Sequence, residues 1–409
     1  MVADKYRDII RKTFRVILIA GVLLSFSACS EKLVLEPEMQ RSVLIYIAGD
    51  NDLSSSFLAN INTLKRGGFL PFNGNIIIYL DVPNANPRFF RLVRNRTTNA
   101  IEEELIEHYT KEDGRATDPA VLTRTLNRTR ELFPAKEYGL ILLSHASGWV
   151  PHGMLSSLYL RQSSLFAAPS YARLEDLPTT RAFGGYRSDR GMEIDELVAA
   201  IPYRLSFILF DTCVMGSIEV AYALRNVADY LIASPTEILS SGFPYDKIMQ
   251  PMFLPRPDLK AVCNDFYNFY NEAPDGPWRS ASIALYHTEP LEELAHVLRP
   301  IFSAHRTALN HFSTDNVQHY ANAPIFYDLD HFILQLATPS EYALFKASLD
   351  KVVLHKRNTD YFFTLILSIA SIPITHFGGI STYIPINAQS AIRAAYTETE
   401  WNRAVGMLE

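Results

Sequence analysis

Phe207-Ile208-Leu209-Phe210-Asp211-Thr212-Cys213 is an uninterrupted apolar run that ends in two polar residues and a thiol. A continuous apolar strand, unlike an alternating one, is typical of a strand buried on both faces. The run Leu-Ile-Leu-Leu at 140–143 has the same character and is followed by Ser144 and His145. Two strands that are expected to be buried therefore end in chemically reactive residues.

Other apolar runs alternate with segments of helical spacing along the first half of the chain. Strands are expected at 43–48, 76–80, 140–143, 207–210 and 230–233, and helices at 117–133, 194–201 and 217–227. Strands separated by helices pair in parallel through right-handed crossovers. The pattern therefore predicts an α/β fold, with a mostly parallel sheet covered by helices on both faces, over residues 42–254.

The character of the sequence changes after Pro251 and Pro255. Helices are expected at 257–275 and 289–311, and strands at 281–286 and 380–386. We interpret residues 255–409 as a C-terminal α+β domain, with an extension of the first sheet as the alternative. The uncharged stretch 361–375 is shorter than the roughly 20 residues of a membrane span and contains a proline, so it is interpreted as a buried core element.

The N-terminus has the pattern of an export signal. Five basic residues precede the apolar run Val16–Phe26, which is too short to span a bilayer. The run is followed by Ser27, Ala28 and Cys29, which resembles a lipobox. We therefore expect a signal peptide at 1–28, lipidation of Cys29, a tether at 29–41 and attachment to the membrane of the cell envelope. A plain secretory signal is the alternative.

Composition excludes several classes of protein. The chain has 409 residues, 48 % of them hydrophobic, and a formal net charge of −6, so no basic surface for nucleic acid is expected. No zinc-protease, phosphate-loop, dinucleotide-binding, C-x-x-C or G-x-S-x-G motif occurs. Besides Cys29 the chain has Cys213 and Cys263, whose pairing the sequence leaves open. If Cys213 is unpaired, catalysis would account for it.

The residues that follow the two strands suit thiol chemistry. The carboxyl ends of parallel strands meet at one edge of a sheet, so His145 and Cys213 are expected at the same edge. A helix N-terminus and an imidazolium both stabilise a thiolate, and the imidazole can protonate a leaving amine. The structural alternatives are a capping or surface histidine and a cysteine that acts as a small hydrophobic residue.

Six short motifs occur in order along the chain. They are IYIAGDNDL at 45–53, SHASGW at 144–149, DTCVMGSIEV at 211–220, SPTE at 234–237, GFPYD at 242–246 and GISTYIP at 379–385. Together they resemble the motifs of the clostripain family of cysteine peptidases, which are related to caspases, gingipains and legumains. The resemblance implies a caspase-like fold and a peptidase activity.

The same resemblance implies the roles of individual residues. Cys213 attacks the scissile carbonyl, His145 protonates the leaving amine, and the backbone N–H groups of Cys213 and Ala146 bind the oxyanion. Family members usually have glycine after the histidine, so the methyl group of Ala146 is expected to crowd the substrate or to exclude a positive φ. A caspase-like binding lipoprotein with impaired catalysis is the alternative that Ala146 favours.

Two acidic residues are candidates for the S1 pocket. By the resemblance Asp211 forms its floor and would pair with Arg or Lys at P1, and Glu237 is a second candidate wall. Asp211 as a helix cap and Glu237 in a helix-start role are the alternatives. The resemblance implies no required cofactor. Calcium dependence occurs in the family, although no ligands are assigned in this sequence.

The segment 150–191 is long, irregular and rich in arginine. Loops of this length are usually functional or disordered, and family members can be matured by cleavage after a basic residue. We therefore expect self-processing in this segment. The sequence as a whole predicts an exported lipoprotein endopeptidase that acts on peptides and proteins with Arg or Lys at P1; a different P1 preference is a further alternative.

Overall fold

The computed structural model describes residues 39–155, 191–321, 325–366, 370–385 and 390–408. The predicted signal peptide, the predicted lipidation site Cys29 and most of the predicted tether lie outside the described residues. Most of the segment predicted to be self-processed, residues 156–190, also lies outside them.

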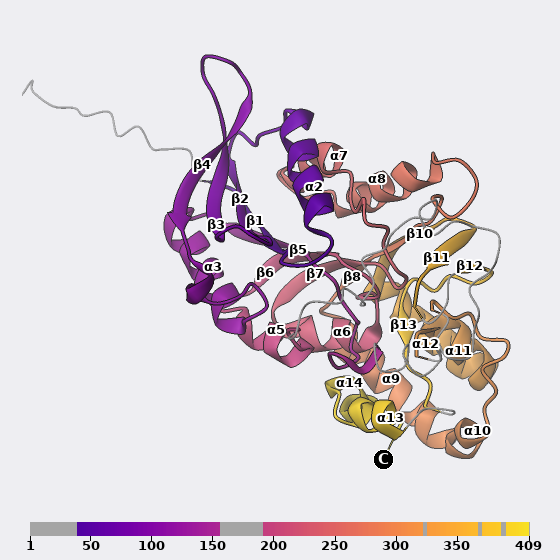
Figure 1. The fold of residues 1–409 in the computed structure, drawn as a ribbon. Coiled ribbons are helices and arrows are strands. Elements are labelled where there is room, and N and C mark those ends of the chain that lie inside the picture. The colour runs from indigo at the N-terminus through magenta and orange to yellow at the C-terminus, as the bar shows by residue number, and fades with distance from the viewer. Residues whose placement is uncertain (1–38, 156–190, 322–324, 367–369, 386–389, 409) are drawn as a thin grey trace, which may run out of the picture. The chain divides into compact units, whose positions relative to one another are not determined.

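A mixed nine-stranded sheet forms the centre of the molecule (Figure 1). In spatial order its strands are β10 (Val353–Asn358), β8 (Ser282–His287), β7 (Ala228–Ala233), β6 (Leu205–Asp211), β5 (Glu137–Leu143), β1 (Arg41–Ala48), β2 (Gly74–Asp81), β3 (Arg88–Arg94) and β4 (Ile101–His108). The five central strands, β7 to β2, are parallel, and two antiparallel strands flank them on each side. The predicted α/β class is therefore confirmed.

The apolar runs of the sequence occupy the most buried positions of this sheet. Residues 43–47 of β1, 76–80 of β2 and 207–211 of β6 are all buried. Helices cover both faces of such strands, so each side chain finds an apolar partner whichever way it points. Apolar and polar residues do not alternate in these strands because both faces of the sheet are buried.

Helices lie on both sides of the sheet (Figure 1). On one side, α2 (Ser54–Gly67), α7 (Tyr245–Met252) and α8 (Leu259–Asn271) contact one another in turn. On the other side lie α3 (Pro119–Leu132), α5 (Ile194–Ala200), α6 (Ile218–Ala223), α14 (Glu400–Val405), α9 (Leu291–Ala304) and α12 (Pro339–Val352). Two faces covered by helices are the layer architecture expected for a buried parallel sheet.

The predicted boundary at 254/255 does not separate two compact units. Residues 39–409 form one unit, because β8 and β10 add to the edge of the same sheet. Arg41, fully buried at the start of β1, also links β1 to the residues just before this boundary. Its Nη1 donates to the carbonyls of Met252 at 2.6 Å and Leu254 at 3.1 Å, and its guanidinium pairs with Glu137. Strands β8 and β10 therefore extend the first sheet beyond the predicted boundary.

Two small strand pairs complete the C-terminal part. β11 (Tyr361–Thr364) and β12 (Ala370–Pro373) pair antiparallel, and β9 (Tyr327–Asp328) pairs with β13 (Ser381–Thr382). The stretch 361–375, predicted to be a buried core element, is buried only in its first part: β11 is buried from its second residue, whereas β12 alternates between half-buried and exposed positions. Among the described residues, none of the helices has the length and apolar character of a membrane span.

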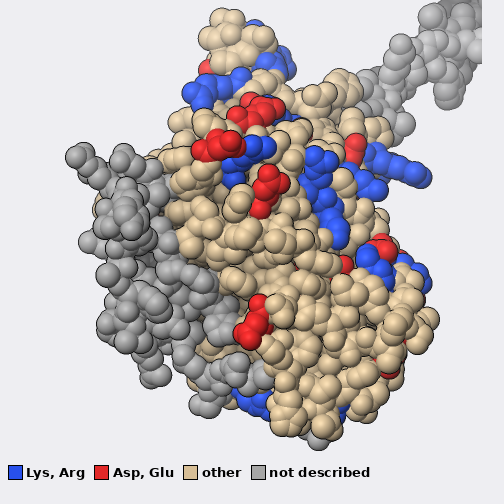
Figure 2. All heavy atoms as spheres, turned by 90° about the vertical axis from the view of Figure 1, so that its right-hand side faces the viewer, with Lys and Arg blue, Asp and Glu red and all other residues tan. Residues whose placement is uncertain are grey.

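Charges of both signs are mixed on the face of the molecule that carries β10 to β12. Figure 2 shows this face, on which Lys and Arg lie among Asp and Glu and a large area has neither. The described part of this face therefore has no broad basic surface of the kind that binds nucleic acid.

Candidate active site

The pairing of β5 with β6 places the two reactive residues at one edge of the sheet. The two strands are parallel, and Leu143 pairs with Asp211. His145 and Cys213 each follow two residues after this pair, so the loops that carry them leave the sheet side by side. The juxtaposition expected from the sequence is therefore present in the backbone.

The imidazole of His145 is held by a carboxylate. Its Nε2 lies 2.7 Å from Oδ1 of Asp52, whose side chain is 65 % exposed, whereas that of His145 is 10 % exposed. This hydrogen bond is the main cause that lowers the pKa of Asp52. Nδ1 of His145 is buried and has no hydrogen-bond partner within the described part of the chain.

Asp52 is a site residue that sequence reasoning missed, since Asp50 and Asp52 both suit an ordinary turn after β1. The order of the strands contains the missing signal. β1 and β5 are parallel neighbours, and Ile47 pairs with Leu143. The residues after β1 must therefore lie beside the residues after β5, which include His145.

The thiol of Cys213 is buried. Neither Cys213 nor Cys263 forms a disulfide in the described part of the chain, so the pairing that the sequence left open is not formed. Sγ of Cys213 accepts a hydrogen bond from the Ile238 amide at 3.2 Å and lies 3.6 Å from the Ile238 carbonyl. The side chain has no exposed surface.

The turn at residues 212–216, which carries the predicted nucleophile (the nucleophile turn), is strained. Val214 has a φ of 51°, which is rare for a β-branched residue and costs on the order of 1–3 kcal/mol. Two hydrogen bonds stabilise this conformation: the Val214 amide donates to Thr236 at 3.0 Å, and the Gly216 amide donates to Ser234 at 2.8 Å. In turn, the Gly216 carbonyl accepts from the amide of Ser381 at 2.9 Å. The turn is thus fixed between the end of β7 and β13.

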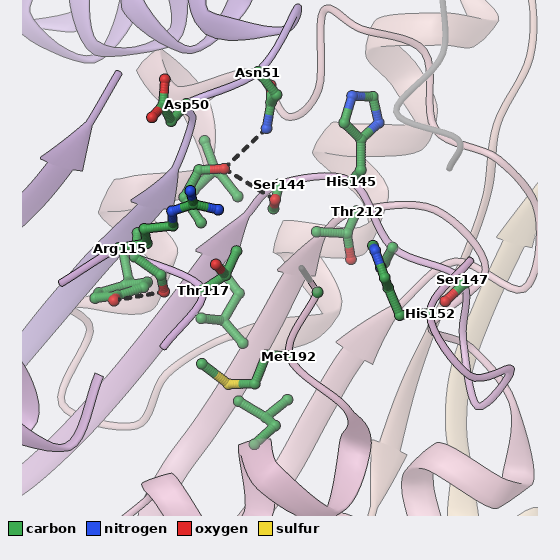
Figure 3. Close-up of a pocket in the computed structure, with 18 of the residues that line it drawn as sticks. Asp50, Asn51, Arg115, Thr117, Ser144, His145, Ser147, His152, Met192 and Thr212 are labelled. Atoms are coloured by element: carbon green, nitrogen blue, oxygen red, sulfur yellow. Dashed lines mark hydrogen bonds between the residues drawn. The ribbon is translucent and has the colours of Figure 1, made fainter. Parts of the chain in front are cut away.

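A cavity of about 740 Å³ opens at this edge of the sheet (Figure 3). Its wall includes Asp52, His145 and Ala146, and Thr212 and Met215 from the nucleophile turn. Asp211 and Cys213 do not line it, because successive side chains of an extended segment point to opposite sides. The histidine therefore faces the cavity while the thiol points to the other side of its own chain.

Ala146 occupies its position without backbone strain. Among the described residues, only Asn84, Asn99 and Val214 have a positive φ without being glycine. The methyl group of Ala146 therefore does not conflict with its backbone conformation. Its role in binding an oxyanion remains a prediction.

The two acidic candidates for the S1 pocket have different surroundings. Asp211 is fully buried, and its Oδ2 accepts from the Tyr245 hydroxyl at 2.9 Å. Glu237 is also buried, and its carboxylate accepts from the hydroxyl of Thr364 and from the amides of Leu365 at 2.9 Å and Ile366 at 3.2 Å. Glu237 thus holds the segment beside Ile238 to β11, and its role as an S1 wall remains a prediction.

Glu219 is a third buried carboxyl group, on α6 just after the nucleophile turn. Its Oε1 accepts from the Thr382 hydroxyl and the Tyr383 amide, both at 2.9 Å. Burial is the main cause that raises its pKa to about 7, although these hydrogen bonds oppose the shift. The group therefore connects the nucleophile turn to β13 in a protonation-dependent way.

Glu219 is expected to make the protein less stable as the pH rises. A group whose pKa is raised on folding binds its proton more tightly in the folded state, so its contribution is complete below pH ~4.5 and lost as pH rises through ~7. At 1.36 kcal/mol per pKa unit, the loss is roughly 3 kcal/mol. Glu219→Gln should flatten this part of the pH dependence of the unfolding free energy, measured by denaturant titration from pH 4.5 to 8. Equal slopes for both proteins would refute the assignment.

One group of residues in the described part has the spacing of metal ligands: Asp328, Asp330 and His376. It does not suit calcium, which takes six to eight oxygen ligands, because one member is an imidazole. The carboxylates already accept hydrogen bonds: Asp330 from His376 at 3.0 Å and Asp328 from the Gly378 amide at 2.6 Å. We therefore assign no calcium ligands to this group.

Comparison with known proteins shows what the chain is similar to. The sequence model of the clostripain family matches residues 175–361. Clostripain from Hathewaya histolytica is 26 % identical over 241 residues, a match that covers 51 % of this chain and 41 % of clostripain. The chain thus corresponds to less than half of the length of that relative.

Solved structures match over more of the chain. An inactive zymogen of a C11 protease from Parabacteroides distasonis is 31 % identical, with a TM-score of 0.74, and the match covers 90 % of this chain and 99 % of the other. A secreted C11 cysteine protease from Bacteroides thetaiotaomicron in complex with an irreversible peptide inhibitor is 25 % identical, with a TM-score of 0.73 and coverage of 90 % and 98 %. From its fold, its motifs and these matches, the chain belongs to the clostripain (C11) family of cysteine proteases.

Proposed function

We propose that this protein is an exported, membrane-tethered cysteine endopeptidase that cleaves after Arg or Lys, with Cys213 as nucleophile and His145 as general acid. The observation that carries the proposal is the pairing of Leu143 with Asp211, which brings the loops of both residues to one edge of the sheet. Membership of a family of cysteine proteases supports the reaction class.

The proposed reaction follows from these two side chains. The Cys213 thiolate attacks the scissile carbonyl, and the oxyanion is held by the backbone N–H groups of Cys213 and Ala146. The C–N bond then breaks as the His145 imidazolium gives its proton to the departing amine. In the second half, His145 takes a proton from water, whose oxygen attacks the acyl group and releases the thiolate.

Activation of the thiol requires one local rearrangement. Sγ of Cys213 is bonded to the backbone of Ile238 on the side away from the cavity that His145 lines. We infer that the described conformation is a latent one and that the segment around Ile238 moves aside in the active enzyme. One of the similar solved structures is an inactive zymogen, which supports this interpretation.

A basic P1 residue is the preference that Asp211 supports. Asp211 lies two residues before Cys213, so its side chain is on the same side of the chain as the thiol. A buried carboxylate in that place would favour a guanidinium or ammonium group, since pairing offsets the cost of its burial. Tethering through a lipid on Cys29, taken from the sequence pattern, and the absence of a required cofactor, taken from the family resemblance, are further parts of the proposal.

The proposal is tested by assaying the protein without residues 1–28 on fluorogenic peptides that differ only in having Arg, Lys, Asp or Asn at P1. We expect turnover of the Arg and Lys peptides that is blocked by thiol alkylation. If the Asp or Asn peptides are turned over instead, the proposed preference for a basic P1 residue is wrong. A folded protein without turnover of any peptide would favour the binding lipoprotein.

Self-processing is expected within residues 150–191, which contain several arginines. Because the protein's own Cys213 would make the cut after a basic residue, the wild-type chain should separate into two fragments on denaturing gels, and Cys213→Ala should stay whole. Mass spectrometry of the new termini should place the cut after Arg or Lys. If both proteins stay as one chain under conditions where the wild type hydrolyses peptides, the hypothesis is wrong.

A further inference from the structure

We propose that Asp52 is the positioning residue of the catalytic histidine: it binds Nε2–H of His145, so that Nδ1 is the nitrogen that transfers the proton to the leaving group. The inference rests on the proposed function and assigns a third side chain to the same site. It is carried by the contact of 2.7 Å between Asp52 Oδ1 and His145 Nε2.

The chemistry of the contact fixes which nitrogen carries the hydrogen. An ionised carboxylate can only accept hydrogen bonds, so the hydrogen lies on Nε2. In the neutral imidazole, Nδ1 then has the free lone pair, and in the imidazolium it has the second N–H. The lowered pKa of Asp52 keeps its carboxylate ionised at neutral pH.

The environment of Nδ1 points to the same assignment. This atom is buried but has no hydrogen-bond partner among the residues that the structure describes. A buried polar atom without a partner is unfavourable by about 1–3 kcal/mol and usually has a functional explanation. A thiol, a leaving amine or an attacking water would supply the missing partner during the reaction.

Asp52 is held in place by a shared backbone acceptor. The Ala48 carbonyl at the end of β1 accepts from Asn51 Nδ2 and from Ser144 Oγ, both at 3.0 Å (Figure 3). Asn51 also accepts from the Leu53 amide at 3.0 Å and so closes the turn that contains Asp52. Asn51 precedes Asp52, and Ser144 precedes His145. The two hydrogen bonds to the Ala48 carbonyl therefore fix the loops of the carboxylate and the imidazole relative to each other.

The expected contribution follows from this geometry. Asp52 keeps the ring in one orientation and tautomer and stabilises the imidazolium that donates the proton, without touching the substrate. Because its carboxylate is largely exposed, solvent screens the charge and the effect is smaller than that of a buried partner. We expect a loss of kcat of about 10- to 100-fold when the carboxylate is removed, with KM unchanged within about 2-fold.

The test compares Asp52→Asn and Asp52→Ala with the wild type on an amide and an activated ester that share one acyl part. An amine must be protonated as it leaves, whereas an activated alcohol leaves with little help. The variants should therefore lose kcat/KM, which reports the steps up to acylation, on the amide while staying within about 3-fold in kcat/KM on the ester. Asn, whose oxygen still accepts from Nε2–H, should retain more activity than Ala. Equal losses on both substrates, or no loss, would overturn the proposal.

Glu289→Gln is the matched control. Glu289 Oε2 lies 3.5 Å from Nε2 of His287, so the variant also removes a carboxylate beside a histidine. Its side chain is 82 % exposed, and neither residue lines the cavity. The control should have wild-type rates on both substrates.

A measurement without turnover separates this proposal from the proposed function. In Cys213→Ala protein, ¹⁵N chemical shifts should give the Nε2–H tautomer for His145, and adding Asp52→Ala should change the tautomer population. The other tautomer, or no change, would overturn the role of Asp52 whether or not the wild type is a peptidase. Conversely, absence of Cys213-dependent turnover would overturn only the proposed function.

Discussion

Cys213→Ala is expected to lower kcat for peptide hydrolysis by at least about 10⁴-fold, because the acyl-enzyme cannot form without Sγ. Any remaining rate would come from substrate binding and oxyanion stabilisation alone. The measurement is hydrolysis of an Arg-P1 peptide at saturating substrate, with the reactive sites of the wild type counted by an irreversible inhibitor.

Two variants control for the folding of Cys213→Ala. Sγ accepts the Ile238 amide, so the alanine leaves a buried N–H without its partner at a cost of about 1–3 kcal/mol. Cys213→Ser keeps an acceptor there and should be as inactive as the alanine. Cys263→Ala removes the other buried thiol, whose pKa burial raises strongly, and should keep the activity. Activity in folded Cys213→Ser comparable to that of the wild type would contradict the nucleophile assignment.

Asp211→Asn is expected to reduce kcat/KM for Arg-P1 peptides by about 10²- to 10³-fold. The amide cannot neutralise a guanidinium, and loss of one member of a buried charge pair costs roughly 2–5 kcal/mol. Peptides with a neutral P1 residue should change by only a few-fold. The measurement is the ratio of kcat/KM for Arg and norleucine at P1 in the wild type and the variant.

The substitution leaves the local packing in place, since the asparagine oxygen can still accept from the hydroxyl of Tyr245. Tyr245→Phe is the companion variant, because it removes that hydrogen bond but keeps the carboxylate. It should therefore keep the preference for Arg. If Asp211→Asn lowers kcat/KM equally for the Arg and norleucine peptides, Asp211 stabilises the site without binding the P1 side chain.

The centre of the fold was predictable because each central strand is apolar throughout. The antiparallel strands at the two edges of the sheet could not be predicted in the same way. β3 and β4 are rich in charged residues, since Arg88 pairs with Glu103 and Arg91 with Glu104 across the two strands. Such ladders stabilise a half-exposed sheet without leaving an apolar run in the sequence. β8 was expected as a strand, but its pairing with β7 joins segments that are distant in sequence, which no local pattern reports.

The candidate site was predictable to the level of its loops. The positions of His145 and Cys213 after two buried strands place them at one edge of the sheet. The direction of each side chain depends on tertiary contacts that the sequence does not encode locally, such as the strained turn at Val214 and the bonds of Sγ to Ile238. The role of Asp52 required the knowledge that β1 and β5 are neighbours.

The loops after β1 and β5 both donate a hydrogen bond to the main-chain carbonyl oxygen of Ala48. Every amino acid supplies this atom, so mutational drift at position 48 leaves the acceptor itself intact. The alignment of the two loops therefore depends on the side chains of the two donors, Asn51 and Ser144. In a set of homologous sequences, these two positions should therefore vary less than the residue to which they bind.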